Sequence, residues 1–381
     1  MTPSSGVLRT DQVLPRYGEA SLADLLPSAL GALGVAGEQD VLGLPQCRSL
    51  CLLVVDGLGG TLLRSHPAEA PFLTSLPDRR LTSGVPSTTA ASLVSIGTGL
   101  PPGRHGLVGY TSRVPGTDLL LNALRWDQPV DPLEYQPHPT VLERAAQAGV
   151  AVTAVSQRRF RTSGLTRAGL RGGTFVGADT LGERVASAAS AAVSPAGTPA
   201  LVYVYEGDLD LTGHRLGCGS AAWRHQLAMV DRFAEELYEA LPRGCVLVVT
   251  GDHGMLDVPF EGRLDVDDVP ALREGVALVG GEARLRHVYA RDGAGDDVLA
   301  AWQESLGTRA AVLTREAAIA AGWFGAVEAR VAPRIGDVVV ACGADLAVEL
   351  RSVFPAEATL LGLHGSLSED EMVIPLLVAE A

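Results

Sequence analysis

Residues 49–60 read SLCLLVVDGLGG, and this stretch decides the kind of fold that the chain can form. Its first seven residues are nearly all apolar, which is typical of a strand buried on both faces of a parallel sheet. The apolar run ends at Asp56, and glycines follow at positions 57, 59 and 60. Glycine lets the backbone turn sharply and approach a ligand closely. The stretch therefore predicts a carboxylate at the carboxyl edge of a parallel sheet, where open α/β sheets bind their ligands.

Helices and strands alternate along the chain up to residue 250. Leucines spaced behind Ser21 predict a helix over 21–34, which Pro27 would bend or split. Further strands are expected at 150–156, 200–206 and 245–250, and further helices at 90–98, 141–149, 181–192 and 221–240. This alternation predicts an α/β fold, a three-layer sandwich with a mostly parallel central sheet.

The composition excludes several classes of protein. A chain of 381 residues with 47% hydrophobic residues can bury a large core. The formal net charge of −14 argues against binding to nucleic-acid polymers or to anionic membranes. All 30 basic residues are arginine, so the chain has no lysine for a pyridoxal Schiff base or for a P-loop.

The cysteines and the N-terminal sequence bear on location. The five cysteines form no C-x-x-C pair and are odd in number, which fits reduced thiols in the cytoplasm. The N-terminus lacks the pattern of a signal peptide, and no run of 18 apolar residues occurs. We expect a soluble, cytoplasmic protein with no membrane partner; its oligomeric state is left open.

Carboxylates and histidines follow several of the apolar runs, in an arrangement that suits two divalent metals. Two such ions about 3.5–4 Å apart can clamp the attacking and leaving oxygens of a phosphoryl transfer. Gly213 is expected to let residues 210–214 form one tight turn that presents a carboxylate together with an imidazole. The hydroxyls at 87–89 precede a predicted helix whose N-terminus would attract an anion. The candidate ligands are Asp56, Asp210, His214, Asp252, His253 and His364.

The pattern of predicted helices and strands changes near residue 262. From there to about residue 342, short helices and strands in mixed order replace the regular helix–strand alternation, which predicts a small α+β insertion. We expect residues 1–261 to form the metal-binding α/β catalytic core and residues 262–345 to form the inserted subdomain. Residues 346–381 would return to the core and carry the last metal ligand.

Five segments together resemble the alkaline phosphatase superfamily, in particular its nucleotide pyrophosphatase/phosphodiesterase-like branch. They occur in that family's order and span most of the chain: VVDGLGG at 54–60, VPSTTAASLVSIGTG at 85–99, DLTGH at 210–214, TGDHGM at 250–255 and LHGS at 363–366. The resemblance implies an alkaline phosphatase-like fold, two Zn²⁺ ions and a phosphothreonine intermediate.

The resemblance also assigns the ligands. It gives one zinc to Asp210, His214 and His364. The other zinc goes to Asp56, Asp252, His253 and the nucleophile, which matches Thr89. A threonine hydroxyl is a weak nucleophile at neutral pH, and a metal favours its alkoxide, so the residue type agrees with that role. Thr88 is the next choice for the nucleophile.

Two features bear on the substrate. Tyr110 stands where diesterases of the family carry an asparagine that helps to bind a phosphate oxygen, and a phenol can donate one hydrogen bond there. Arg158, Arg159 and Arg161 form the only dense basic cluster of the sequence. They form either a solvated loop or a clamp for an anionic part of the substrate.

The resulting hypothesis is a zinc-dependent hydrolase of phosphodiesters or nucleotide pyrophosphates, acting on a small phosphate-ester substrate through phosphothreonine. A phosphomonoesterase or a phosphonate hydrolase would share all of these metal ligands and is the alternative. Sulfatase activity is disfavoured because no Cys-x-Pro-x-Arg sequence occurs. A noncatalytic, metal-stabilised binding module is the hypothesis from a different class.

Overall fold

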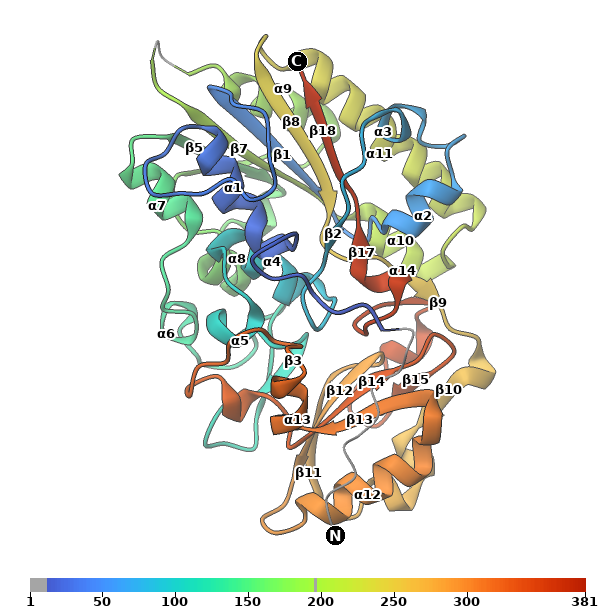
Figure 1. The fold of residues 1–381 in the computed structure, drawn as a ribbon. Coiled ribbons are helices and arrows are strands. Elements are labelled where there is room, and N and C mark those ends of the chain that lie inside the picture. The colour runs from blue at the N-terminus through green and yellow to red at the C-terminus, as the bar shows by residue number, and fades with distance from the viewer. Residues whose placement is uncertain (1–11, 195–196) are drawn as a thin grey trace.

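A six-stranded sheet forms the centre of the larger part of the molecule (Figure 1). The computed structural model describes residues 12–194 and 197–381. The strands run parallel except β18, which pairs with β8 in the antiparallel sense. In spatial order they are β18 (Leu376–Glu380), β8 (Cys245–Gly251), β1 (Ser49–Val55), β7 (Ala200–Glu206), β5 (Ala151–Ser156) and β6 (Thr174–Gly177). The mostly parallel sheet predicted from the sequence is therefore confirmed.

Strand β1 separates two hydrophobic cores. All seven of its residues are buried, and alternate side chains point to opposite faces of the sheet. Leu50, Leu52 and Val54 belong to one core, together with α1 (Leu25–Ala32), α4 (Thr89–Thr98) and α7 (Val141–Gln147). Cys51, Leu53 and Val55 belong to the other, together with α9 (Leu181–Ala192) and α11 (Ala221–Ala240). Helices thus cover both faces of the sheet and complete the three layers.

The predicted helices begin where polar side chains cap them. Thr140 and Thr180 each form a capping box with the glutamate three residues later, and Ser220 accepts a hydrogen bond from the N–H of Trp223. The helix expected at 21–34 is divided into a 3-10 turn (Leu22–Asp24) and α1. Pro27 lies in the first turn of α1, where its missing N–H is not needed.

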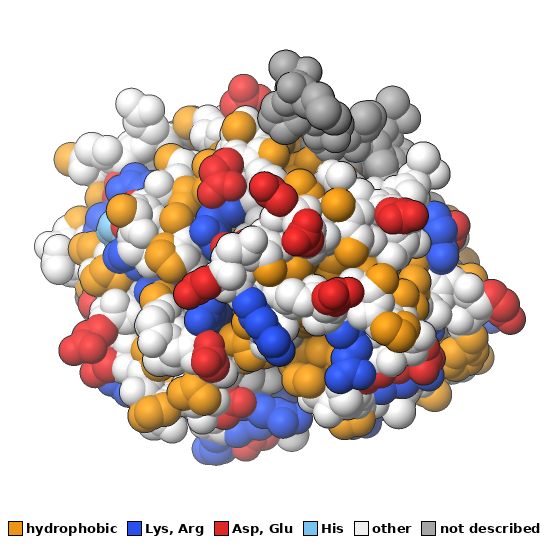
Figure 2. Space-filling view, turned by 90° about the horizontal axis from the view of Figure 1, so that it is seen from below, with side chains coloured by type: hydrophobic (Ala, Val, Ile, Leu, Met, Phe, Trp, Pro, Cys, Tyr) orange, Lys and Arg blue, Asp and Glu red, His pale blue; other side chains and the backbone are white. Residues whose placement is uncertain are grey.

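A second, antiparallel sheet forms the smaller part of the molecule. Its strands are ordered β11 (Val276–Glu282), β12 (Leu285–Ala290), β14 (Val338–Cys342) and β13 (Ala310–Thr314), with helix α12 (Gly295–Leu306) packed beside them. Leu346, Val348 and Leu350 also lie in this smaller core, although they follow the 262–345 segment. Figure 2 shows the end of the molecule that carries this sheet, where acidic and arginine side chains are interspersed.

The two parts are joined by a small hydrophobic cluster and by a buried ion pair. Strand β9 (Leu256–Asp257) pairs with β16 (Gly362–Leu363), which directly precedes His364, and Leu256 and Leu363 pack with Ala283 of the turn between β11 and β12. Arg284, in the turn between β11 and β12, donates to both carboxylate oxygens of Glu371 in the larger part. These links hold the end of β11 against the carboxyl edge of the central sheet. None of the described helices has the length and apolar character needed to cross a membrane.

Candidate metal centre

The ends of β1 and β8 bring three predicted ligands together. Asp56 follows β1, whereas Asp252 and His253 follow the neighbouring β8, and the two strands pair in parallel up to Val55 and Gly251. The Oδ1 atom of Asp252 accepts hydrogen bonds from the N–H of Gly57 at 3.0 Å and from its neighbour His253 at 2.9 Å. The adjacent strands thus deliver two buried carboxylates and an imidazole to one place, as the sequence predicts.

Asp210 and His214 come from a helix, which corrects the expectation of a tight turn. They lie four residues apart on α10 (Asp208–Leu216), a spacing that places both side chains on one helix face. The Nε2 atom of His214 is 3.4 Å from Oδ2 of Asp210. Gly213 serves close packing and not a bend, because a Cβ there would lie 2.5 Å from Sδ of Met255.

The three histidines of the centre share one arrangement, in which Nδ1 faces a backbone carbonyl and Nε2 faces the other ligands. Nδ1 of His214 donates to the carbonyl of Gly362 at 2.7 Å, and Nδ1 of His253 donates to its neighbour Gly254 at 2.9 Å. Nδ1 of His364 donates to the carbonyl of Ser87 at 2.9 Å. A backbone acceptor on one ring nitrogen presents the lone pair of the other to a metal.

The ligand atoms form two compact groups that fit two ions. One group contains Asp56, Asp252 and His253, and the other contains Asp210, His253 and His364, with the atoms of each group within 4.8 Å of one another. Oδ1 of Asp210 and Oδ2 of Asp252 are buried and have no hydrogen-bond partner among the described residues. Burial and the charge of Asp56 raise the pKa of both carboxyls well above their usual range. Cations would satisfy these oxygens and offset the repulsion.

His253 occupies the middle of the centre. It belongs to both groups, and its ring stacks on that of His364 with centroids 3.7 Å apart. His214 lies beside Asp210 but belongs to neither compact group. The division of the ligands between two ions, including the pairing of His214 with Asp210 and His364, stays a prediction.

Thr89 is the hydroxyl that faces both groups. It is the first residue of α4, and its Oγ1 lies 3.2 Å from Nε2 of His253 and 3.4 and 3.5 Å from the two oxygens of Asp56. Ser87 instead donates its hydroxyl to the carbonyl of Ser366 at 2.7 Å. Thr88 is the N-cap residue with an extended backbone. The geometry therefore favours Thr89 among the three hydroxyls.

Two residues at the centre were missed by the sequence analysis. Tyr205 donates its hydroxyl to Oδ2 of Asp56, and burial raises the pKa of this phenol well above its usual range. A partial signal was available, because Tyr205 is the penultimate residue of the strand expected at 200–206, but only the structure shows that this strand pairs with β1. Glu282, at the end of β11, places Oε2 3.6 Å from Nδ1 of His364, and burial raises the pKa of Glu282 to about 8. No sequence signal indicated that the smaller sheet reaches the centre.

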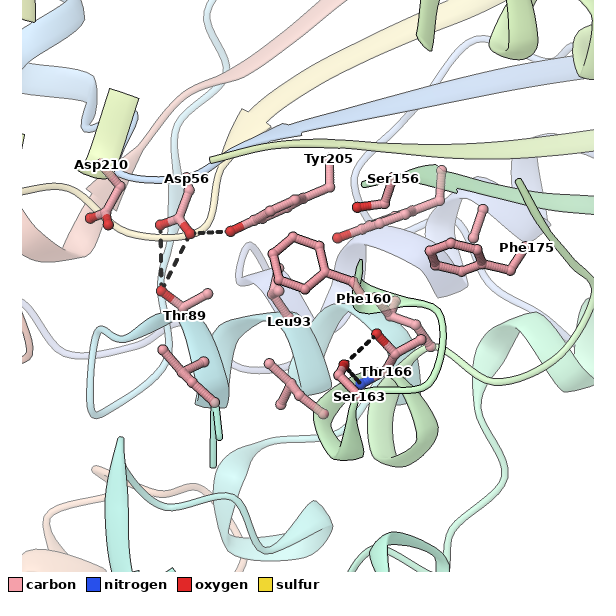
Figure 3. A pocket seen from close by; sticks show the side chains of 15 residues that line it. Asp56, Thr89, Leu93, Ser156, Phe160, Ser163, Thr166, Phe175, Tyr205 and Asp210 are labelled. Carbon is pink, nitrogen blue, oxygen red and sulfur yellow. Dashed lines mark hydrogen bonds between the residues drawn. The ribbon is translucent and has the colours of Figure 1, made fainter. Parts of the chain in front are cut away.

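A largely apolar pocket of about 170 Å³ opens beside Thr89 (Figure 3). Asp56, Thr89 and Asp210 lie at one end of the view and Phe175 lies at the other. The ring of Phe160 packs edge-on against Tyr205, with centroids 6.0 Å apart. A cavity of about 150 Å³ lined by apolar side chains can hold benzene, so this pocket has room for one planar ring.

The candidate substrate residues have separate surroundings. Arg158 forms ion pairs with Asp179 and Glu183. The guanidinium groups of Arg159 and Arg161 lie over the rings of Phe160 and Phe175, which line the pocket. Tyr110 precedes β3 (Thr111–Arg113) and is not among the residues that line the pocket. A role for Tyr110 in binding a phosphate oxygen stays a prediction.

The fold and the site together define a class of protein. A buried cluster of carboxylates and imidazoles lies at the edge of a parallel sheet, with a hydroxyl at a helix N-terminus and a ring-sized pocket beside it. This combination is that of a metal-dependent hydrolase of phosphate esters.

The chain belongs to the type I phosphodiesterase/nucleotide pyrophosphatase family, since the model of that family matches residues 50–367. The resemblance found in the sequence is thereby confirmed, and the chain is a hydrolase of phosphodiester or pyrophosphate bonds. No curated protein sequence matches it.

Solved structures share the fold. Mouse ectonucleotide pyrophosphatase/phosphodiesterase 5 has a TM-score of 0.70 at 17% identity, over 86% of this chain and 87% of that chain. Its human counterpart has a TM-score of 0.68 at 17% identity, over 87% of each chain. A third structure is an inactive threonine-to-alanine variant of the mouse protein in complex with AMP, with a TM-score of 0.69 at 17% identity, over 86% of this chain and 87% of that chain.

Proposed function

We propose that the chain hydrolyses phosphodiesters or nucleotide pyrophosphates with two zinc ions and a covalent phosphothreonine at residue 89. The observation that carries this proposal is the position of Thr89 Oγ1, 3.2 Å from Nε2 of His253 and beside both ligand groups. The pocket next to it suits an arm of the substrate that ends in a planar ring. The AMP complex of the mouse relative supports a nucleotide as one such arm.

Zinc fits the donors of this centre. Imidazole and carboxylate ligands both suit zinc, and three histidines here present Nε2 while three aspartates present oxygens. Asp56, Asp252 and His253 would hold one ion, and Asp210, His214 and His364 the other. When bound, such ions neutralise charge on the phosphoryl oxygens and activate the nucleophile.

The side chains of the protein position the reaction. Thr89 Oγ1 gives up its proton to solvent and attacks phosphorus, so that a P–O bond forms. The bond to the leaving oxygen breaks, and that oxygen departs with the electron pair and takes a proton from solvent. The N-terminal turn of α4 points its N–H groups towards the developing negative charge. Water then cleaves the phosphothreonine ester, which releases the phosphate monoester and restores the hydroxyl.

Diesters are favoured over monoesters by the charge around the pocket. A monoester dianion places one more charged oxygen at the centre, and that oxygen needs a cation or several donors. None of the described residues that line the pocket is an arginine. The ratio of activity on bis(p-nitrophenyl) phosphate to activity on p-nitrophenyl phosphate tests this preference.

A cytoplasmic location also stays a proposal, which cell fractionation would test.

Replacing the nucleophile gives the main test. Thr89→Ala should keep both zinc ions but lower kcat by about 10³-fold or more, because the attacking oxygen is lost while the aspartate and histidine ligands remain. Thr88→Ala is the matched control and should keep most of the activity. Mass spectrometry after brief exposure to bis(p-nitrophenyl) phosphate should find a p-nitrophenylphosphoryl group on Thr89, because one p-nitrophenolate leaves and the other stays on phosphorus. An active Thr89→Ala protein that carries this group on Thr88 would overturn the assignment.

A further inference from the structure

The three arginines in the loop after β5 have different surroundings. Arg158 is neutralised, because its Nε lies 2.8 Å from Asp179 and its Nη2 lies 3.2 Å from Glu183. Arg159 and Arg161 are exposed and form no ion pair with any described carboxylate. In a chain with a net charge of −14, these two guanidinium groups remain available to an anion from outside.

Both available guanidinium groups lie against the wall of the pocket. The Cζ atom of Arg159 is 4.6 Å from the ring centroid of Phe160, and that of Arg161 is 5.3 Å from the ring centroid of Phe175. Both rings line the pocket. A guanidinium stacked on a ring keeps the N–H groups at its edge free for a carboxylate or a phosphate.

The carboxylates of the centre and the two arginines lie at different parts of the pocket. Figure 3 places Asp56, Thr89 and Asp210 at one end and Phe175, on which Arg161 stacks, at the other. Phe160, on which Arg159 stacks, lies between these ends. Phosphorus must lie next to Thr89 for attack. An anion held by the arginines would therefore belong to the arm that fills the pocket, either at its far end beside Arg161 or nearer its middle beside Arg159.

We propose that Arg159 and Arg161 form a cationic rim that selects phosphodiesters whose pocket-bound arm carries a second anionic group. This inference rests on the proposed function, because it assigns one arm of the diester to the pocket. The volume of about 170 Å³ admits one planar ring. The recognised feature is a planar ring with an oxyanion, either on the ring or on a sugar attached to it.

Equilibrium binding to the zinc-loaded Thr89→Ala protein tests the rim without consuming the probe. One pair of probes is p-nitrophenyl phenyl phosphate and its 4-carboxyphenyl analogue. The other pair is thymidine 5′-(p-nitrophenyl phosphate) and the same compound with a 3′-phosphate. In at least one pair the charged member should bind about tenfold more tightly, and high salt should reduce this preference. The pair that shows it tells whether the oxyanion lies on the ring or on the sugar.

Three variants separate charge from packing. Arg159→Gln with Arg161→Gln should bring the affinities within each pair to about twofold of one another. Arg158→Gln, the matched control, should leave the preference unchanged, since Arg158 is already paired. Arg159→Lys with Arg161→Lys should keep part of the preference, because it keeps both charges but loses the stacked guanidinium groups.

The proposal is overturned if neither pair shows a preference, or if the glutamine variant weakens both members of a pair equally. It is also overturned if the lysine variant behaves like the glutamine variant. Failure of the proposed function has a separate signature, which is the absence of hydrolysis of all four probes by the wild-type protein.

Discussion

Replacing the hydroxyl of Tyr205 tests whether its hydrogen bond to Asp56 stabilises the metal centre. The hydroxyl donates to Oδ2 of Asp56, so that Oδ1 of the same carboxylate faces Nε2 of His253 at 3.3 Å. Burial keeps the phenol protonated by raising its pKa, and it therefore stays a donor at neutral pH. We expect Tyr205→Phe to release this carboxylate and to weaken zinc binding at the position that contains Asp56, while the ring still lines the pocket.

The expected size of this effect follows from the hydrogen bond that is lost. A hydrogen bond to a charged group contributes about 1.5–3 kcal/mol, which corresponds to roughly 10- to 150-fold in an equilibrium constant. Loss of an outer partner of a metal ligand typically costs about 10- to 100-fold in metal affinity or activity. We therefore expect zinc affinity at this position to fall about 10- to 100-fold, with a parallel fall in kcat when zinc is limiting.

Competition against a chelator measures this affinity. An Asp210→Asn background removes a ligand of the other ion, so the titration reports the position that contains Asp56. Tyr203→Phe is the matched control, because Tyr203 lies two residues earlier on β7 and its buried hydroxyl has no hydrogen-bond partner among the described residues. Its zinc affinity should stay within about twofold of the parent. Equal zinc affinity in Tyr205→Phe and Tyr203→Phe would refute the reasoning.

Three further outcomes are expected. Native mass spectrometry of the zinc-loaded chain should find two ions, and Asp56→Asn or Asp210→Asn should each leave about one, since each removes a ligand from a different group; two ions in both variants would contradict the assignment. Nε2 of buried His287 donates to the carbonyl of Val108 at 2.8 Å, its Nδ1 accepts from Gly336 at 3.2 Å, and burial lowers its pKa from 6.5 to about 4. The imidazole is therefore protonated at a higher pH in the unfolded chain than in the folded one, and the free energy of unfolding falls by ~3 kcal/mol as the pH drops from 6.5 towards 4. His287→Gln should make the midpoint of denaturant unfolding depend less on pH in this range. Arg184→Met should destabilise the fold by about 3–5 kcal/mol in denaturant titrations, because it leaves the buried carboxylate of Glu206 unpaired, and adding Glu206→Gln should recover part of this loss.

Local signals in the sequence were sufficient for the elements of the larger sheet. The run at 49–55 contains no charge or proline, so it can only be stable where both of its faces are covered, and it forms the buried strand β1. The helices at 181–192 and 221–240 begin at Thr180 and Ser220, whose side chains satisfy free N–H groups of the first turn. A cap side chain bonds to an N–H within three residues of it, so the local sequence is enough to predict where these helices begin.

Contacts between distant segments were not predictable in this way. The sequence suggested a tight turn at 210–214 because a glycine precedes His214, but the segment continues as α10, where Gly213 allows close packing against Met255. Glu282 reaches His364 only because the smaller sheet is docked on the larger one. Neither contact leaves a periodic signal near the residue concerned.

The sequence by itself determined the parallel α/β sheet, the strand ends that carry Asp56, Asp252 and His253, and the family. Each of these depends on residues that are close together in the chain. The tertiary structure alone decided which nitrogen of each histidine of the centre faces a backbone carbonyl, which aromatic rings form the pocket, and which of the three clustered arginines is paired with carboxylates. These properties depend on backbone carbonyls, rings and carboxylates supplied by other segments, and only the packing of those segments brings them within reach.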